Sequence, residues 1–406
     1  MAVNNQGPPG SDVSQADRAR AILKASAASV GRFQAPELFY TQDVSFAAVN
    51  SLNVPRPLNL NRPIESMQIR LRFRVTVTVG NIGTVAPEAP QTMLQSLILN
   101  GTHRQYGNLT PIRMSGATVF AWQRLFQGQG NDLLINESLA AGPGRPFTSP
   151  FLGTTGASPY DIEITYNIPF GPQMGIGQSA KRDLASYLLQ PADWGDTLQL
   201  QLNFGDQTAL GIIAPATVAF SAYGSAAGSP SCSIYLNYSI LGPFANSLET
   251  GVVVKQEQLY PQFITAGTAL RIAQLQKQIT TGVLVKSGTQ QGAPTTAGVV
   301  NFVTLTDRQL DRTQILTDNK PVKNNQNNIG MKAYLQRMFN TVHPAGYFML
   351  SFVEGQNPQL AYRGDGLAGG SLYELYSDVL TTGATQIMGV TQEMIYGGPF
   401  MSLRPA

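Results

Sequence analysis

The feature that most constrains the fold is an alternating stretch at residues 69–79. Its apolar positions are Ile69, Leu71, Phe73, Val75, Val77 and Val79, and between them stand Arg70, Arg72, Arg74, Thr76 and Thr78. Successive side chains of a strand point to opposite faces of its sheet, so this stretch has one apolar face and one polar face. Such a strand is typical of an antiparallel sheet with one side buried, which favours an all-β architecture. The three arginines require solvent, acidic neighbours or a polyanion opposite them.

The composition agrees with a loop-rich β protein. The chain has 406 residues, a length that suits two domains of about 150 to 200 residues each. Only 13% of its residues are charged, against about 25% in typical soluble proteins. A low charge content suits a surface that neighbouring subunits cover, because interface cores are depleted of charge. The net charge of +3 argues against sequence-specific nucleic acid binding by the chain as a whole.

Turn-forming residues divide the chain into three expected parts. Residues 1–38 form an N-terminal arm with a helix at about 14–29, residues 39–245 form a first β domain, and residues 246–406 form a second. The arm is basic, and its candidate contact residues are Arg18, Arg20, Lys24 and Arg32. Such an arm could lie against a neighbouring subunit or an anionic surface, or it could be a solvated tail, and the sequence leaves these alternatives open.

Alternation and turn chemistry predict strands in both domains, with a few helices. Strands are expected at 44–52, 69–79, 94–99, 161–168, 197–204, 217–223 and 233–241, and then at 251–254, 270–272, 282–286, 299–306, 347–353 and 386–396. Helices are expected at 119–126, 180–189 and 331–342. The helix, proline and strand within 180–204 resemble those within 331–353, a weak internal echo that suggests duplication.

Residues for catalysis or metal binding are scarce. His103, His343 and Cys232 are too few for a site of histidine and cysteine ligands. Cys232 is expected to be a buried thiol and His103 a loop residue. Asp307 and Asp311 alternate with arginines and are expected to form a solvated charge cluster in a loop. The chain has no expected signal peptide or membrane-spanning stretch, and we expect no enzymatic activity, cofactor or metal.

One glycine-rich segment imitates a dinucleotide-binding loop. Gly175-Ile176-Gly177-Gln178-Ser179-Ala180 fits the spacing of that motif. Pro169-Phe170-Gly171-Pro172 separates it from the preceding strand, however, and the following strand alternates, whereas a central parallel strand is apolar throughout. The segment is therefore interpreted as a loop that leads into a helix.

Two runs carry a resemblance to a known family. Tyr166-Asn167-Ile168-Pro169-Phe170-Gly171, the helix at 180–189, Trp194 and the strand ending in Leu200-Gln201-Leu202-Asn203-Phe204 resemble the first jelly roll of double jelly-roll major capsid proteins. The family is that of tectivirus-like, internal-membrane icosahedral phages of the adenovirus-hexon lineage. There, a helix lies between the sixth and seventh strands. Residues 62–79 resemble an early strand of that family, and residues 331–353 and 386–396 resemble its second jelly roll.

The resemblance implies two consecutive eight-stranded antiparallel jelly-roll sandwiches with short helices in loops. It implies homotrimers of pseudo-sixfold outline that tile an icosahedral virion shell after synthesis in the host cytoplasm, with minor capsid and vertex proteins as partners. The arm, with Arg18, Arg20, Lys24 and Arg32, would lie near an internal viral membrane and neighbouring subunits.

Two alternatives remain from the sequence. One is a jelly-roll receptor-binding or vertex protein that uses Tyr362, Tyr373 and Tyr376. A more distant one is a nucleotide-dependent enzyme that uses the Gly175 loop.

Overall fold

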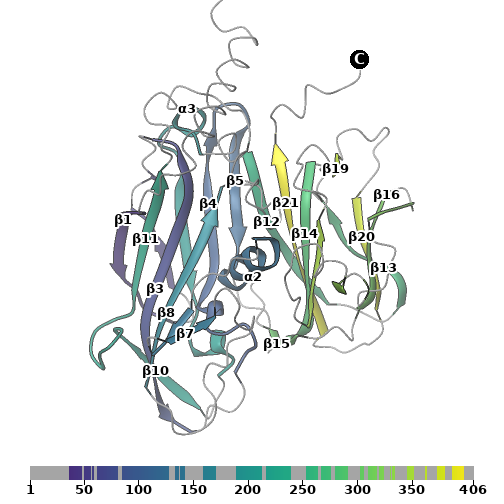
Figure 1. The fold of residues 1–406 in the computed structure, drawn as a ribbon. Helices are drawn as coiled ribbons and strands as arrows, with labels where there is room; N and C mark the ends of the chain where they lie inside the picture. The colour runs from purple at the N-terminus through teal and green to yellow at the C-terminus, as the bar shows by residue number, and fades with distance from the viewer. Residues whose placement is uncertain are drawn as a thin grey trace, which may run out of the picture.

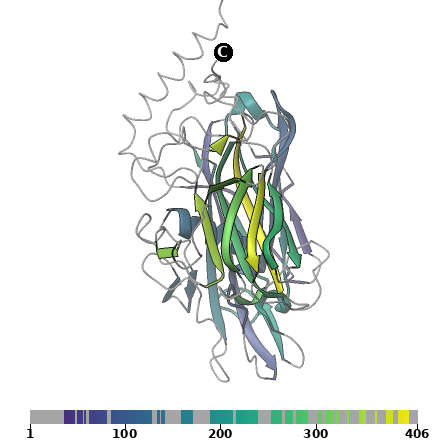
Figure 2. The ribbon, with the colours of Figure 1, turned by 90° about the vertical axis from the view of Figure 1, so that its right-hand side faces the viewer.

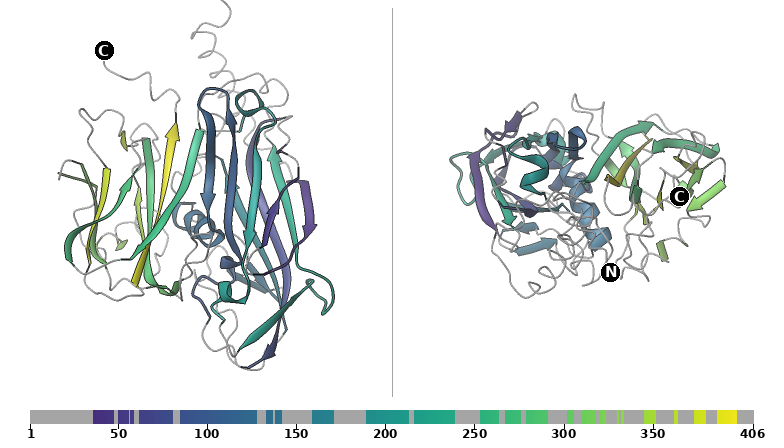
Figure 3. Two further views of the ribbon diagram at one scale, coloured as in Figure 1. Left: turned by 180° about the vertical axis from the view of Figure 1, so that it is seen from behind. Right: turned by 90° about the horizontal axis from the view of Figure 1, so that it is seen from above.

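The computed structural model is built almost entirely of strands. It describes residues 36–47, 50–55, 57–58, 62–80, 85–127, 133–136, 138–141, 159–170, 189–212, 216–238, 253–263, 267–275, 279–290, 302–305, 310–317, 320–323, 330, 332–333, 345–351, 362–363, 373–379 and 386–396. Two lobes lie side by side, and the strands of both run in the same general direction (Figures 1 and 2). The view from above separates the two lobes most clearly (Figure 3).

Three sheets contain these strands. The seven-stranded sheet has the order β1 (Glu37–Asp43), β11 (Ser231–Tyr238), β3 (Ile64–Val79), β8 (Tyr160–Pro169), β6 (Leu133–Ile135) and β7 (Ser138–Ala141), and β10 (Thr217–Ser221) also pairs with β3. The four-stranded sheet has the order β13 (Gly267–Leu275), β20 (Tyr373–Val379), β16 (Leu310–Thr317) and β17 (Lys320–Lys323).

The ten-stranded sheet runs through both lobes. Its order is β15 (Phe302–Leu305), β14 (Ile279–Gln290), β21 (Gln386–Tyr396), β12 (Val253–Phe263), β5 (Gly107–Met114), β4 (Leu94–His103), β9 (Gln199–Phe204) and β2 (Asn50–Asn53). β18 (Tyr347–Ser351) and β19 (Tyr362–Arg363) pair with β14.

The order of the strands shows the same topology twice. Eight strands of the first lobe, taken along the chain, are β1, β2, β3, β4, β5, β8, β9 and β11. The first, eighth, third and sixth of them are neighbours in one sheet, and the second, seventh, fourth and fifth are neighbours in the other. The second lobe repeats both orders with β12, β13, β14, β16, β17, β18, β20 and β21. Two four-stranded layers with these strand orders make one eight-stranded jelly roll, and the chain contains two of them. The expected fold class is therefore confirmed.

A helical segment lies at the same place along the chain in the two jelly rolls. α2 (Gly116–Gln127) stands between the fifth and sixth strands of the first, and helical residues at 330 and 332–333 stand between the fifth and sixth strands of the second. The expected correspondence between residues 180–204 and 331–353 was therefore wrong. The strand in the first segment, β9, is the seventh of its jelly roll, whereas the strand in the second segment, β18, is the sixth of its own. Residues 180–188 of the helix expected at 180–189 lie outside the described residues, as does the arm helix at 14–29, and Leu189 forms an isolated β-bridge with Ile64.

Shorter helices lie in other connections of the first jelly roll. They are η1 (Gln91–Met93), α3 (Pro191–Trp194) and η4 (Gln207–Leu210). Within the described ranges, we find no helix that is both long and apolar enough to cross a membrane.

The core of the first jelly roll follows from the alternating strand. Ile69, Leu71, Phe73 and Val75 are fully buried between the two sheets. Phe73 packs edge-on against Phe46 with ring centroids 4.9 Å apart. Each fully buried side chain of this size contributes about 1.5–3 kcal/mol relative to an exposed one, so this strand anchors the sandwich.

Several expected strand boundaries were wrong for identifiable reasons. Of the strand expected at 44–52, only residues 50–52 lie in a described strand, because β1 ends at Asp43 and β2 begins at Asn50. Between them, Val44 and Phe46 are buried while the chain crosses from one sheet to the other. β5 escaped prediction because Pro111 interrupts its pattern, and proline is tolerated mainly in edge strands. Asp311 lies in β16 and not in a loop.

Candidate functional site

The junction between the two jelly rolls is a direct continuation of one sheet into the other. β5 pairs with β12 in parallel, with Ile112 opposite Gln256 and Arg113 opposite Glu257. β5 is the fifth strand of the first jelly roll, and β12 is the first strand of the second. The two sandwiches are thus joined edge to edge by backbone pairing, and α2 lies in the angle between them (Figure 1).

The central strands of the second jelly roll are buried on both faces. Residues 281–288 of β14 and 389–394 of β21 are all buried. Because successive side chains alternate in direction, burial of consecutive residues means that both faces are covered. One of these faces is polar, and its buried members include Gln256, Lys286, Thr391 and Glu393. The first jelly roll covers this face at least in part, as the contacts of Lys286 show.

Glu88, Lys286 and Tyr347 form a buried polar cluster across the junction. Glu88 precedes η1 in the first jelly roll, and its carboxylate Oε1 accepts hydrogen bonds from Nζ of Lys286 and from the hydroxyl of Tyr347. Lys286 and Tyr347 face each other across β14 and β18. Burial, and then the charge of Glu88, raise the pKa of Tyr347 well above its ordinary value. Removing one partner of a buried ion pair costs about 3–5 kcal/mol, so this cluster holds the lobes in one arrangement.

Glu393 is a second buried carboxylate on the same face. Its Oε2 accepts from Nε2 of Gln256 at 2.8 Å, and its Oε1 accepts from the hydroxyl of Thr281 at 2.5 Å. Gln256 stands opposite Glu393 across β12 and β21, so the hydrogen bond joins neighbouring strands. A satisfied buried network of this kind makes the packing of β12, β14 and β21 within the second jelly roll specific.

The outer face of the first jelly roll carries the three arginines of β3. Arg74 donates to both carboxylate oxygens of Asp161, at 2.8 and 2.7 Å. Arg70 and Arg72 both pair with Glu163, the latter through Nε at 3.1 Å. We name these five residues the arginine face. The acidic neighbours that the sequence required are therefore supplied by β8, which runs antiparallel beside β3.

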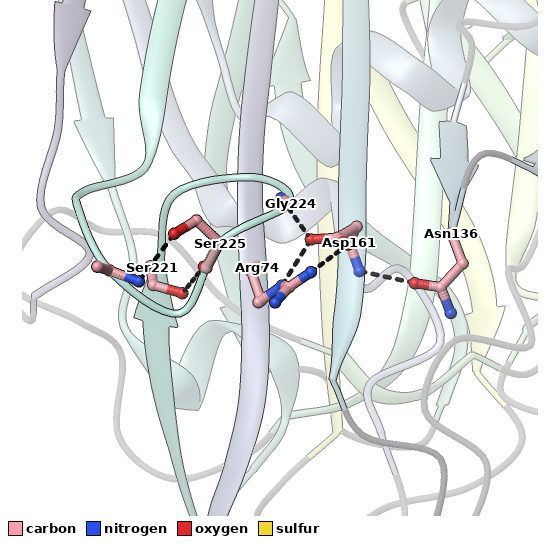
Figure 4. A network of polar contacts seen from close by, with 7 residues as sticks. Arg74, Asn136, Asp161, Ser221, Gly224 and Ser225 are labelled. Atoms are coloured by element: carbon pink, nitrogen blue, oxygen red, sulfur yellow. Dashed lines mark hydrogen bonds and ion pairs between the residues drawn. The ribbon is translucent and has the colours of Figure 1, made fainter.

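Further contacts fix the position of Asp161 (Figure 4). Its Oδ1 accepts from the backbone N–H of Gly224, and its own N–H donates to Oδ1 of Asn136. The hydrogen bonds from Arg74 lower the pKa of Asp161, with a smaller contribution from the Gly224 N–H. The guanidinium of Arg72 lies over the ring of Tyr223, 4.4 Å from its centroid. The side chains of Arg70 and Arg72 nevertheless stay 36% and 41% exposed, so this face remains accessible in a single chain.

His103 was wrongly expected in a loop. It is the last residue of β4 and is buried, stacked on Tyr106 and edge-on to Trp194. Its Nδ1 accepts from the backbone N–H of Gln105, and Nε2 lies 4.0 Å from Oδ1 of Asp193. His103 is therefore packed between aromatic side chains at one end of the first jelly roll.

Other expected residues have mixed outcomes. Cys232 is buried as expected, and burial raises the pKa of its thiol to about 12. Tyr362 lies in β19, and Tyr373 and Tyr376 lie in β20. The arm residues Arg18, Arg20, Lys24 and Arg32, the Gly175 loop and His343 lie outside the described residues. In the part of the chain that the structure describes, no three histidine, cysteine, aspartate or glutamate side chains gather as a metal site.

The sequence did not reveal the cluster of Glu88, Lys286 and Tyr347. Its members are separated by 198 and 259 positions along the chain. A lysine amid the apolar residues of β14 was the one available signal, because a charge in such a strand needs a partner.

Comparison with solved structures identifies the fold. No protein-family model matches the sequence, and a search of curated proteins finds no match. The crystal structure of the STIV MCP has a TM-score of 0.56 and 11% identity, and the alignment covers 91% of this chain and 98% of that one. The atomic structure of Sulfolobus Turreted Icosahedral Virus gives 0.54 and 13%, covering 91% and 93%. The major capsid protein of Bacteriophage PM2 gives 0.50 and 8%, covering 90% and 98%.

The chain has the double jelly-roll fold. The similarity extends over both sandwiches, because about nine-tenths of the chain is aligned in each case. The double jelly roll also agrees with the repeated strand order found within the chain.

Proposed function

We propose that this protein is a major capsid protein, a structural coat subunit without enzymatic activity. The observation that carries the proposal is the edge-to-edge union of two jelly rolls of the same strand order in one chain. The similar structures support it, since they are those of an icosahedral virus and of a major capsid protein. The place of the protein would then be the virion shell, after synthesis in the host cytoplasm.

Two similar sandwiches per chain favour a trimer as the unit of assembly. Three copies around a threefold axis place six sandwiches in a ring, which has a nearly hexagonal outline. Closed rings form when a head-to-tail contact repeats with the right rotation. Such a trimer can tile a shell, with neighbouring trimers and with minor capsid and vertex proteins as further partners.

The parts of the chain have separate roles in this proposal. Residues 39–245 and 246–406 are the two expected jelly-roll domains and residues 1–38 the expected arm, and β1 extends the first domain back to Glu37. Arg18, Arg20, Lys24 and Arg32 of the arm would contact neighbouring subunits or the anionic face of an internal membrane. A juxtamembrane cation contributes about 1 kcal/mol of attraction to anionic lipid, so the arm would bind such a surface reversibly.

Negative-stain microscopy of the purified full chain tests the proposal. We expect particles of hexagonal outline that form ordered sheets or shells as the concentration rises. A particle without threefold symmetry that never forms a lattice would contradict the proposal and favour a receptor-binding or vertex protein.

A further inference from the structure

Among the described strands, two sheet edges are left without the edge-to-edge pairing that joins the two jelly rolls of the chain. In each jelly roll, the first strand ends one four-stranded layer and the fifth strand ends the other. Within the chain, the fifth strand of the first jelly roll, β5, pairs with the first strand of the second, β12. The remaining pair consists of β17, the fifth strand of the second jelly roll, and β1, the first strand of the first. Each of these two strands stands at the end of its sheet among the described strands.

We propose that the contact between copies repeats the contact between the two jelly rolls of one chain, so that β17 of one copy lies parallel beside β1 of the next. This inference rests on the proposed function, because it needs a closed ring of copies. A ring of six sandwiches has six contacts, three within chains and three between copies. The structure of one chain already gives the first kind. Edge strands have N–H and C=O groups that can pair with another chain. The contact would be short, because β17 has four residues and its Pro321 has no N–H, just as β5 and β12 pair over only two residues.

The charges of the two strands are complementary. β1 begins with Glu37 and ends with Asp43, whereas β17 begins with Lys320 and ends with Lys323. Parallel strands place like ends together, so alignment of their C-terminal ends would place Asp43 near Lys323, whereas Glu37 already pairs with Arg62 of its own chain. β1 is also largely exposed, and Leu38 on it is 57% exposed. A large apolar side chain on a free edge gains burial when a second strand covers it.

The arginine face has a counterpart that shows how it would be covered. In the second jelly roll, the equivalent layer of β12, β21, β14 and β18 has its outer polar face buried, with Lys286 of the third strand bound to Glu88 of the preceding jelly roll. In the first jelly roll, the third strand is β3, and its arginines occupy the corresponding face. Three arginines face two carboxylates there, so one positive charge remains available to a carboxylate of the preceding copy.

Burial along the two third strands supports this equivalence. β14 is buried at every position from 281 to 288, whereas β3 alternates between buried and half-buried residues from Met67 to Val75. This difference is expected if the outer face of the second jelly roll is covered by the first jelly roll of the same chain, while the outer face of the first is covered only by another copy.

Two matched substitutions on the full chain test the proposed edge contact. Leu38→Asp on β1 should raise the concentration at which trimers dissociate by about tenfold or more, the ratio that corresponds to 1.4 kcal/mol. Val79→Asp is its control, because Val79 is equally exposed at 56% but lies at the far end of β3, outside the proposed contact. The control should leave the trimer unchanged, and circular dichroism of both variants checks that they are folded.

A charge exchange tests the partner strand. Asp43→Lys alone and Lys323→Glu alone should each weaken the trimer, and the double variant should restore it, because the attraction is then re-created with reversed signs. If trimers form and neither β1 nor β17 variants weaken them, the edge contact is wrong and the proposed function stands. If the unmodified chain is monomeric at every concentration, both the contact and the proposed function are overturned.

Discussion

The carboxylate of Glu88 and the ammonium group of Lys286 meet in a buried hydrogen bond between the two jelly rolls. Glu88 is 7% exposed and Lys286 is 4% exposed, so neither charge has water as an adequate partner. Taking two charges out of water is costly, and their attraction offsets that cost only while both are present. The pair therefore makes one relative position of the jelly rolls far more favourable than any other.

Replacing Lys286 should destabilise the protein strongly. Lys286→Met leaves the Glu88 carboxylate buried beside the hydroxyl of Tyr347 without the lysine charge, and the expected loss is about 3–5 kcal/mol of unfolding free energy. Denaturant unfolding of the variant measures the loss. The double variant Glu88→Leu with Lys286→Met removes both charges and should recover most of the stability. A single variant as stable as the unmodified chain would contradict the account of this pair.

The arginine face should give the protein a stability that is lost in acid. The pKa of Asp161 is lowered by Arg74, so its ionised form is favoured in the folded chain. A group with a lowered pKa contributes stability above its ordinary value of 3.8, and the contribution disappears as the pH falls through the folded value. Asp161→Asn should therefore be less stable than the unmodified chain at pH 6, and the two should converge as the pH falls below 3.8 through the folded pKa of Asp161.

The control for this experiment is Asp196→Asn, which changes an exposed aspartate in a turn. It should leave the pH profile of thermal unfolding unchanged. Parallel profiles of Asp161→Asn and the unmodified chain down to the lowest pH would show that the Arg74 pair does not contribute.

Cys232 should be inert toward thiol reagents in the folded protein. Its side chain is fully buried, and its pKa is raised to about 12, so the reactive thiolate is scarce at pH 8. Labelling with a chromogenic disulfide should be absent in buffer and complete in denaturant. Rapid labelling in buffer would mean that β11 opens locally or that the thiol is not enclosed by the core.

The arm should bind anionic membranes through its cations. The variant Arg18→Ala, Arg20→Ala, Lys24→Ala should lose most of its binding to vesicles that contain phosphatidylserine, because each cation contributes about 1 kcal/mol. Co-sedimentation measures the bound fraction, and vesicles of phosphatidylcholine alone are the control. Equal binding of the variant and the unmodified chain would assign the arm to a protein contact instead.

The sequence predicted best those strands whose two faces differ. The alternation at 69–79 identified β3 because its apolar face enters the core and its arginine face does not. The strand at 386–396 was predicted with its observed bounds, since turn residues flank it. β16 and β20 were missed because their patterns are irregular, and β5 was missed because of Pro111.

The junction could not be predicted from the sequence. Its residues acquire their roles only when β14 and β18 are placed beside the connection that carries Glu88, and no local pattern encodes that contact. The arginines were recognised as needing partners, but Asp161 and Glu163 became those partners through the register of β3 with β8. Pairing between distant segments is thus the part of the fold that sequence pattern leaves open.

The central claim is that this chain works as one third of a ring of six jelly rolls. The most direct test is the mass of the purified full chain by light scattering over a range of concentrations. The account predicts a stable particle of three times the 43.6 kDa chain mass. A particle with the mass of one chain at every concentration would contradict it.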